Sequence, residues 1–336
     1  NLMRNLRDED HLRTMISDRM LPLLEEFTVE DVWQAIRMIR GEQPPPDDDL
    51  KWPEWEVLKN PEVAKKSREF HIEEGVVPDI AEGLIKKIVL AKRLLEVKAL
   101  TGFTRIDYIT GEPDDGEFDT TIAKIYKNKP DWLPAVEVRG EGIFIEFSEE
   151  AINEWEINQN VTNRINEIKK THNAWERQRN PERDPKFPGA RYVLIHTLAH
   201  ALILQFSLDC GYPATSLRER IYSSEDPDKK MAGVLIYTAG ADSEGSLGGL
   251  VDLGSNEEFP KLLKKALINL TRCSSDPICA DHQPDVYATI NGAACHACSY
   301  VAETSCELFN RFLDRSLVVP TIHSEEMAFF KDVRNF

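Results

Sequence analysis

The sequence predicts an α+β protein, with mixed helices, small sheets and a C-terminal cysteine-rich zinc-binding module. Stretches with helical apolar spacing alternate with short runs rich in β-branched and aromatic residues, and five of the six cysteines fall near the C-terminus. The 336 residues are enough for two domains of ordinary size or one large one. We therefore expect an N-terminal helical region and linker over 1–80, an α+β region over 81–189, and a zinc-binding domain over 190–336.

The helices predicted near the N-terminus lie within 1–40 and from Pro78 onward. Apolar residues follow helical spacing within 1–40, with a second helix beginning at Thr28. The run GEQPPPDDD over 41–49 ends that helix and forms a linker, because consecutive prolines cannot continue it. A long helical pattern then runs from Pro78 through Ile80, Leu84, Ile88 and Leu95.

The remaining elements alternate between strands and helices. We expect β structure over 99–147, with an acidic turn at 111–119 and a clear strand at 141–147, and then a helix capped at Ser148. The proline-bearing loop over 177–189 is the predicted domain boundary. Beyond it the chain becomes more apolar, and the predicted elements are a buried helix at 192–208, a buried strand at 233–238, and helices at 256–270 and 305–317.

The charge balance argues against a free-standing nucleic-acid binder. The net charge is −17, from 58 acidic and 41 basic residues, whereas phosphate neutralisation needs clustered Lys and Arg. Any DNA contact would then be shared with a more basic partner. Two local basic segments are candidate DNA or partner contacts, although a solvated face or internal ion pairs would explain them equally well. Their residues are Lys86, Lys87, Lys92, Arg93, Arg218 and Arg220.

The sequence predicts a soluble cytoplasmic protein. The N-terminus is polar and charged, unlike a signal peptide, and the longest apolar run, 192–208, is interrupted by polar residues. Cysteines confined to one stretch are also unlike a secreted disulfide framework. The chain begins at Asn1 rather than Met, as a piece of a longer protein would.

The cysteine cluster is the strongest chemical signal. Its spacing is C-x5-C-x15-C-x2-C-x7-C, which spans Cys273, Cys279, Cys295, Cys298 and Cys306. Thiolates spaced as CxxC can reach one tetrahedral ion, and a closed four-coordinate site is structural, so we predict one structural Zn²⁺. Five thiols compete for four positions. The bland alternative, a set of buried unpaired cysteines, is disfavoured by this density.

Two histidines offer a rival site. His196 and His200 share one face of the predicted helix, but Thr197 stands where a zinc metalloprotease carries its glutamate base. Buried histidines bonded to a neighbouring loop are the simpler interpretation. The alternative is a metal-dependent hydrolase or nuclease that uses both histidines and a carboxylate such as Asp242. The Gly-rich loop 240–249 lacks the Lys-Ser/Thr pair of an ATPase phosphate loop and carries two acidic residues. Its charge repels phosphate, so we do not interpret it as a nucleotide-binding loop.

Several motifs together resemble a known family. These are HTLAHAL (196–202), GYPATSLRERIYS (211–223), DWLPAVEVRGEGIFIEF (131–147) and CHACSYVAETSCELFNRFLDR (295–315). They resemble the zinc-binding domain at the C-terminus of MrfA-type DNA helicases, and in detail the DrmB subunits of the DISARM anti-phage system. The resemblance implies metal ligation by Cys295, Cys298 and Cys306 near Asn310. Cys273 and Cys279 then compete for the fourth ligand position.

The resemblance also implies a role. DrmB-type chains pair with DrmA, a large helicase-like ATPase, and the two act together on incoming phage DNA. No Walker loop or paired catalytic set is visible in this sequence, so we expect a non-catalytic, zinc-binding subunit of a DNA-translocating defence complex. DNA would be reached through the complex, and no membrane would be involved.

Overall fold

The computed structural model describes residues 12–13, 29–39, 50–62, 64, 67–103, 123–128, 132–179, 181, 184–238, 249–255, 257–276, 278–287, 289–322 and 324–333. The chain forms two compact units, residues 1–50 with 113–117 and residues 51–112 with 118–336. The first unit contains helix α3 (Val29–Ile39), which confirms the helix predicted to begin at Thr28. The predicted linker 41–49, acidic turn 111–119 and most of the helix predicted near 12–20 lie outside the described residues.

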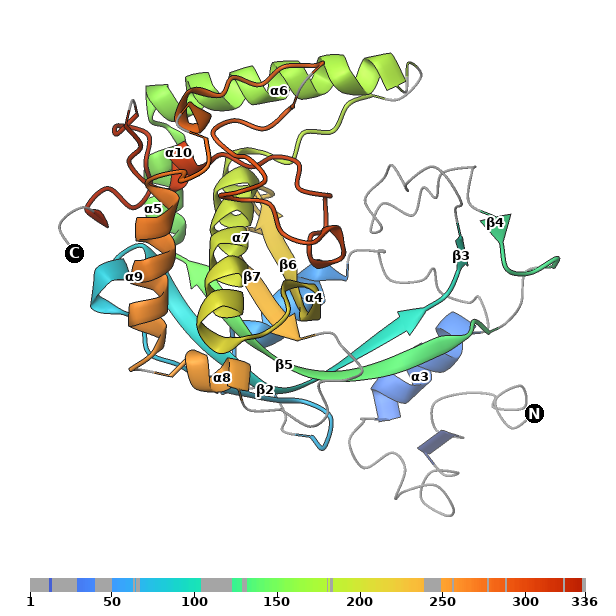
Figure 1. The fold of residues 1–336 in the computed structure, drawn as a ribbon. Coiled ribbons are helices and arrows are strands. Elements are labelled where there is room, and N and C mark those ends of the chain that lie inside the picture. Colours follow the sequence, from blue (N-terminus) through green and yellow to red (C-terminus); the bar gives the residue numbers. More distant parts are fainter. Residues whose placement is uncertain are drawn as a thin grey trace. The chain divides into compact units, whose positions relative to one another are not determined.

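An antiparallel sheet organises the second unit (Figure 1). Its strands follow the order β1-β2-β5-β7-β6, so that the longest strands lie in the middle of the sheet. They come from both sides of the loop 177–189, which connects two parts of one sheet. The strands are β1 (His71–Glu74), β2 (Ile85–Ala99), β5 (Ala135–Phe147), β7 (Met231–Thr238) and β6 (Leu217–Ser224); a separate pair is β3 (Gly102–Phe103) with β4 (Ala123–Lys124).

The two faces of the sheet are covered by different helices. Helix α7 (Ala190–Cys210) shares the main core with Ile88 and Ile143, which point to one face. On the other face, helix α4 (Lys51–Leu58) inserts Trp55 against Phe144, with ring centroids 5.5 Å apart in an edge-to-face arrangement. The central part of the sheet, which includes the buried strand predicted at 233–238, is therefore covered on both faces.

The other helices surround α7 and the sheet. The Ser148 hydroxyl accepts a hydrogen bond from the Ala151 amide and caps α5, which confirms the predicted start of that helix. The helix predicted at 256–270 is also present, as α9. The helices are α5 (Glu149–Glu156), α6 (Gln159–Arg179), α8 (Gly249–Leu253), α9 (Phe259–Leu270) and α10 (Arg315–Val318), and the short 3₁₀ turns are η2 (Asp79–Ala81), η4 (Ala214–Ser216), η6 (Cys279–Asp281) and η7 (Glu303–Ser305).

Helix α7 is the buried helix predicted at 192–208. Among the described residues, one segment, Ala190–Asp209, is long and apolar enough to cross a membrane, but 78% of its most apolar window is buried inside the protein. Burial against a sheet and other helices is what a core helix of a globular protein requires, and it accounts for the apolar composition.

The helix predicted from Pro78 is wrong. Residues 85–99 form strand β2, which pairs along its length with β5. Ile88 is buried on the α7 face, and its neighbour Val89 is buried on the α4 face. Because adjacent residues are both apolar, the strict alternation of a half-exposed strand is lost, and the spacing of Ile80, Leu84 and Ile88 imitates a helix.

The last predicted helix is also wrong. Residues 305–317 form the turn η7, an irregular segment and the short helix α10. Three non-glycine residues of that segment have left-handed backbone, with φ of 53° at Phe309, 58° at Asn310 and 62° at Phe312, which a helix cannot contain. The buried Asn310 side chain compensates by bonding both backbone groups of Val301, at 2.9 and 3.0 Å.

Candidate metal centre

Four of the five clustered cysteines come together between α9 and α10. Cys273 follows the end of α9, Cys279 lies in η6, and Cys295 and Cys298 lie in one turn closed by a 3.2 Å bond from the Cys298 amide to the Cys295 carbonyl. The ligand atoms of these four residues lie within 4.8 Å of one another. None of them is in a disulfide.

The separations of the sulfur atoms fit a tetrahedral site. Cys273 Sγ and Cys295 Sγ are 3.5 Å apart, and Cys298 Sγ is 3.6 Å from both Cys279 Sγ and Cys295 Sγ. Four sulfurs bonded to zinc at about 2.3 Å would be about 3.8 Å apart. The four thiols therefore fit one structural Zn²⁺, which would be closed to further ligands.

The local electrostatics favour a thiolate at Cys298, whereas burial raises the pKa of Cys295. Hydrogen bonding from the Cys279 thiol, with further bonds from Ser299 and from the backbone of Cys295, lowers the pKa of Cys298 to about 5. The Cys298 thiol and burial raise the pKa of Cys279, whereas the buried Arg315 guanidinium opposes that rise. A nearby buried cation suits a zinc ion with four thiolates, which carries a net charge of −2.

A carboxylate and a histidine lie beside the cysteines. Asp276 Oδ2 is 3.1 Å from His282 Nε2, and both side chains lie within 4.8 Å of the Cys279 sulfur. Because thiolates are the preferred ligands of structural zinc, we assign this pair to the surroundings of the centre, where it orients the loop that carries Cys279.

Cys306 does not join the four cysteines. It is buried beside His196, His200 and Glu219, with its sulfur 3.1 Å from His196 Nε2. The ligand set implied by the resemblance, with Cys306 beside Cys295 and Cys298, is therefore not the arrangement found. The chain leaves Cys306 in the irregular segment before α10, not at the start of a helix, so its thiol points to α7 instead of the cysteine turn.

Glu219 is a residue that the sequence argument overlooked. It lies between the basic candidates Arg218 and Arg220, but strand β6 alternates its side chains, so Glu219 points into the core. Its carboxylate lies 3.0 Å from His196 Nε2 and 3.6 Å from His200 Nε2. A charged residue between half-buried neighbours in a strand is the signal that could have revealed it.

The basic candidates are dispersed over two strands, and several are neutralised. The Lys86 ammonium is 2.8 Å from Glu146, and the Arg220 guanidinium is 2.9 Å from Glu54. Lys92 pairs with Glu73, Lys87 donates to the Lys59 carbonyl, and Arg93 donates to the Arg68 carbonyl. Lys86, Lys92 and Arg93 are exposed, whereas Lys87, Arg218 and Arg220 are half-buried.

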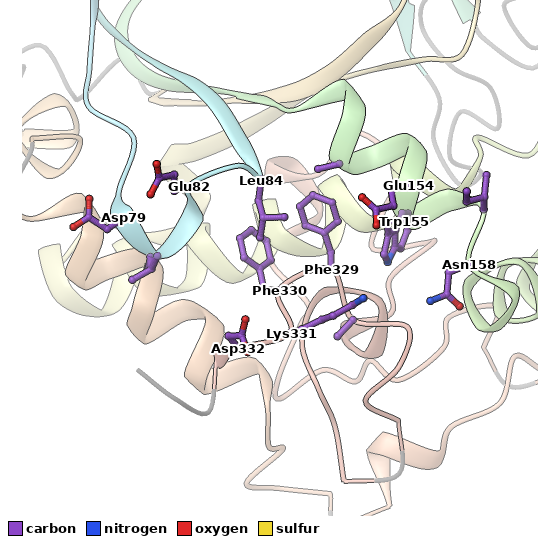
Figure 2. A pocket seen from close by; sticks show the side chains of 14 residues that line it. Asp79, Glu82, Leu84, Glu154, Trp155, Asn158, Phe329, Phe330, Lys331 and Asp332 are labelled. Carbon is purple, nitrogen blue, oxygen red and sulfur yellow. The ribbon is translucent and has the colours of Figure 1, made fainter.

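A cavity of about 660 Å³ lies between η2, α5 and the C-terminal segment (Figure 2). Four carboxylates, of Asp79, Glu82, Glu154 and Asp332, line this cavity together with one ammonium, of Lys331. This charge repels phosphate, so the cavity does not suit nucleic acid.

Comparison with known proteins supports the assignment of the metal centre. Residues 198–299 match the family described as MZB, the MrfA Zn-binding domain, a range that includes the four gathered cysteines and ends before Cys306. The chain is 44% identical over 268 residues, 79% of its length, to the DISARM protein DrmB of Bacillus paralicheniformis, and spans 46% of that protein. The resemblance predicted from the motifs is therefore confirmed: this chain is a relative of DrmB with a match to the MrfA zinc-binding domain.

Proposed function

We propose that this protein is a non-catalytic, zinc-binding subunit of a cytoplasmic anti-phage defence complex of the DISARM type. The observation that carries the proposal is the four-cysteine centre, found within the range that matches the MrfA Zn-binding domain, in a chain 44% identical to a DISARM protein. The zinc would hold the loops between α9 and α10, which have little regular structure of their own, in one conformation.

The partner in this proposal is a DrmA-like helicase ATPase. This sequence contains no ATPase phosphate loop, so in this proposal the energy for moving along DNA comes from a partner subunit. The name of the matching family refers to MrfA, and the motif resemblance implies that MrfA-type proteins carry a helicase on the same chain as this domain. In this proposal a separate ATPase subunit provides the ATP hydrolysis that the helicase region provides in MrfA-type proteins.

DNA would be engaged through the complex. With a net charge of −17, this chain offers little attraction for phosphate, and its proposed contacts number six: Lys86, Lys87, Lys92, Arg93, Arg218 and Arg220. The exposed residues of β2 are the better candidates, because Arg220 is bound to Glu54 and half-buried.

The alternative hydrolase is less well supported. His196 and His200 have no exposed surface, so no substrate could reach a metal bound between them without opening the core. A catalytic zinc site keeps a position open for water or substrate. Asp242, the carboxylate suggested for that activity, lies outside the described residues.

Co-purification followed by an ATPase assay tests the proposed function. The chain is mixed with a DrmA-like ATPase, and DNA-stimulated ATP hydrolysis is measured with and without it. We expect a stable complex and a changed rate, both lost in the variant Cys295→Ser/Cys298→Ser. The matched control is Cys210→Ser, at a cysteine outside the cluster in sequence. No complex and no effect on hydrolysis would overturn the proposal.

A second set of variants tests the β2 contacts. Charge reversal at Lys86, Lys92 and Arg93 should weaken DNA stimulation and reduce its salt dependence, while leaving the complex intact. Lys261→Glu is the matched control, because the Lys261 side chain is 62% exposed on α9 and forms an exposed ion pair with Glu258. Equal effects of the two changes would exclude a specific role for β2.

A further inference from the structure

A second group of metal-binding side chains lies inside the core, apart from the four cysteines. His196 and His200 project from one face of α7, Glu219 comes from β6, and Cys306 follows η7. The imidazole and carboxylate side chains are completely buried, and Cys306 is 8% exposed. The four ligand atoms lie within 4.8 Å of one another. Three separate elements therefore converge on one point.

The hydrogen bonds of His200 leave a lone pair directed at a carboxylate. Its Nδ1 is 2.7 Å from the Ser299 carbonyl, which can only accept, so Nδ1 carries the hydrogen. In the neutral ring Nε2 then presents a lone pair 3.6 Å from Glu219 Oε1. Neither this nitrogen nor Glu219 Oε2 has a hydrogen-bond partner among the described residues. A nitrogen lone pair that faces a carboxylate in a buried site is repelled by it unless a cation lies between the two groups.

His196 has a similar difficulty. Its Nε2 lies 3.0 Å from Glu219 Oε1 and 3.1 Å from Cys306 Sγ. A single ring N–H cannot be directed well at both atoms. If Nε2 instead has a lone pair, then His196 Nε2, Glu219 Oε1 and Cys306 Sγ all present lone pairs to one another. Converging lone pairs are the arrangement of a metal site.

We propose that His196, His200, Glu219 and Cys306 bind a second divalent metal ion, of the zinc class, in a closed structural site. Ligand bonds of about 2.0–2.3 Å in a tetrahedron separate nitrogen, oxygen and sulfur ligands by about 3.3–3.6 Å, close to the separations of 3.0, 3.1 and 3.6 Å between these atoms. Imidazole and thiolate together favour zinc over magnesium or calcium.

The charge of this ligand set suits burial. One carboxylate and one thiolate balance a divalent ion, so the bound site is neutral overall and avoids the large cost of an unbalanced charge in the core. Without the ion, the buried Glu219 carboxylate faces two imidazoles and a thiol.

The surrounding groups orient the ligands as in known metal sites. The Ser299 carbonyl holds His200, the Glu307 amide donates to Glu219 Oε1 at 3.2 Å, and the Asn310 amide donates to Cys306 Sγ at 3.2 Å. The left-handed backbone at Asn310, with φ of 58°, follows from a tight turn that directs this amide at the sulfur. Ser299 directly follows Cys298, a residue of the four-cysteine site, and its carbonyl holds His200 of the second site. The two sites are therefore adjacent along the chain.

Metal content and X-ray absorption of the purified full-length chain test the proposal. We expect two zinc ions per chain. One ion would have four sulfur ligands, and the other would have one sulfur and three nitrogen or oxygen ligands. A single zinc with sulfur ligands alone would overturn the proposal. This measurement needs no variant, so it stands even where a substitution prevents folding, and it is independent of any partner or defence activity.

Substitutions then assign the ions. Glu219→Gln and Cys306→Ser should each reduce the zinc content from two to one and leave an all-sulfur spectrum, because they change one ligand with little change in volume. His172→Gln is the matched control, since His172 is a buried histidine that bonds to a carbonyl outside this cluster, and it should retain two zinc ions. Two ions retained in both ligand variants, with circular dichroism showing a native fold, would also overturn the proposal.

Discussion

Asp314 is a buried carboxylate that joins three segments of the chain. Its Oδ2 accepts a 2.6 Å bond from Arg164 of α6, and its Oδ1 accepts from the backbone amides of Ala293 and Ser316 at 3.2 and 3.0 Å. Arg164 in turn donates to the His282 carbonyl at 2.8 Å, in the loop after η6. This one ion pair therefore connects a long helix to the loops on either side of the cysteine turn.

Loss of one partner of this ion pair should be costly. We expect Arg164→Met to reduce the free energy of unfolding by about 3–5 kcal/mol, because it leaves the Asp314 carboxylate buried without its cation. Urea unfolding followed by circular dichroism measures the change. The control is Glu258→Gln, which removes an exposed pair with Lys261 and should cost no more than about 1 kcal/mol. Similar costs for both variants would contradict this view of Asp314.

His172 should make stability depend on pH. Burial among aromatic rings lowers its pKa from 6.5, although bonding to the Lys186 carbonyl opposes the shift. The unfolded chain then binds a proton at a pH where the folded chain does not, so this contribution to stability is present above pH 6.5 and is lost as the pH falls below it. We expect the stability difference between the wild type and His172→Gln to shrink across this range. A difference that stays constant with pH would exclude this role.

At the scale of elements, α4 docks on the sheet where β7 has no side chain. A Cβ added at Gly233 would lie 2.6 Å from the Trp55 ring and 2.7 Å from the Ile145 carbonyl. Glycine at this position therefore allows the tryptophan to approach the backbone closely. The packing of α4, and through Glu54 its contact with Arg220, depends on that space.

Gly233→Ala should displace α4 and reduce the free energy of unfolding by about 1–3 kcal/mol, the usual cost of overpacking. The double variant with Trp55→Leu should lose less than the sum of the two single variants, because the shorter side chain removes one of the two clashes. Thermal or urea unfolding of all four proteins completes the cycle. Strict additivity would show that α4 does not depend on this glycine.

Elements whose local sequence pattern agrees with their burial could be predicted from the sequence. Elements whose pattern is altered by packing on both faces, or whose conformation depends on distant contacts, could not. The apolar helix α7 and the capped helix α5 were recognisable because local pattern and burial agree. Strand β2 was mistaken for a helix because it is buried on both faces. The segment that holds Cys306 was mistaken because its left-handed turns depend on distant hydrogen bonds of Asn310.

The candidate site followed the same division. The CxxC of Cys295 and Cys298 is a local signal, so its metal-binding role could be inferred from spacing alone. The sequence does not reveal which of the other three cysteines join this pair, because that depends on the path of the chain. Cys273 and Cys279 join Cys295 and Cys298, whereas Cys306 lies with His196, His200 and Glu219. The alternation of β6 indicates that Glu219 faces the core, but its position beside His196, His200 and Cys306 depends on strand pairing and helix packing, which the sequence does not reveal.

The whole molecule has a charge that sets its behaviour toward DNA. At −17, we expect the isolated chain to bind duplex DNA more weakly than the typical non-specific range of about 10⁻⁴–10⁻⁶ M at physiological salt. If the proposed ATPase partner supplies the DNA contact, its addition should restore binding with a steep dependence on salt. Fluorescence anisotropy with a labelled duplex, measured at several salt concentrations, checks both expectations. Tight binding by the isolated chain would contradict an engagement of DNA that depends on the complex.

The main core has a consequence for how the protein is made. It contains residues from Ala81 to Val333, with the C-terminal Phe329 and Phe330 packed among strands and helices that are synthesised much earlier. A ribosome working at about 5–20 residues per second needs about 10–50 s to cover that interval. During this time β2 and β5 can pair, but α7 cannot be fully covered. The nascent chain therefore exposes an apolar helix for many seconds, which makes this protein a natural client for chaperones during translation.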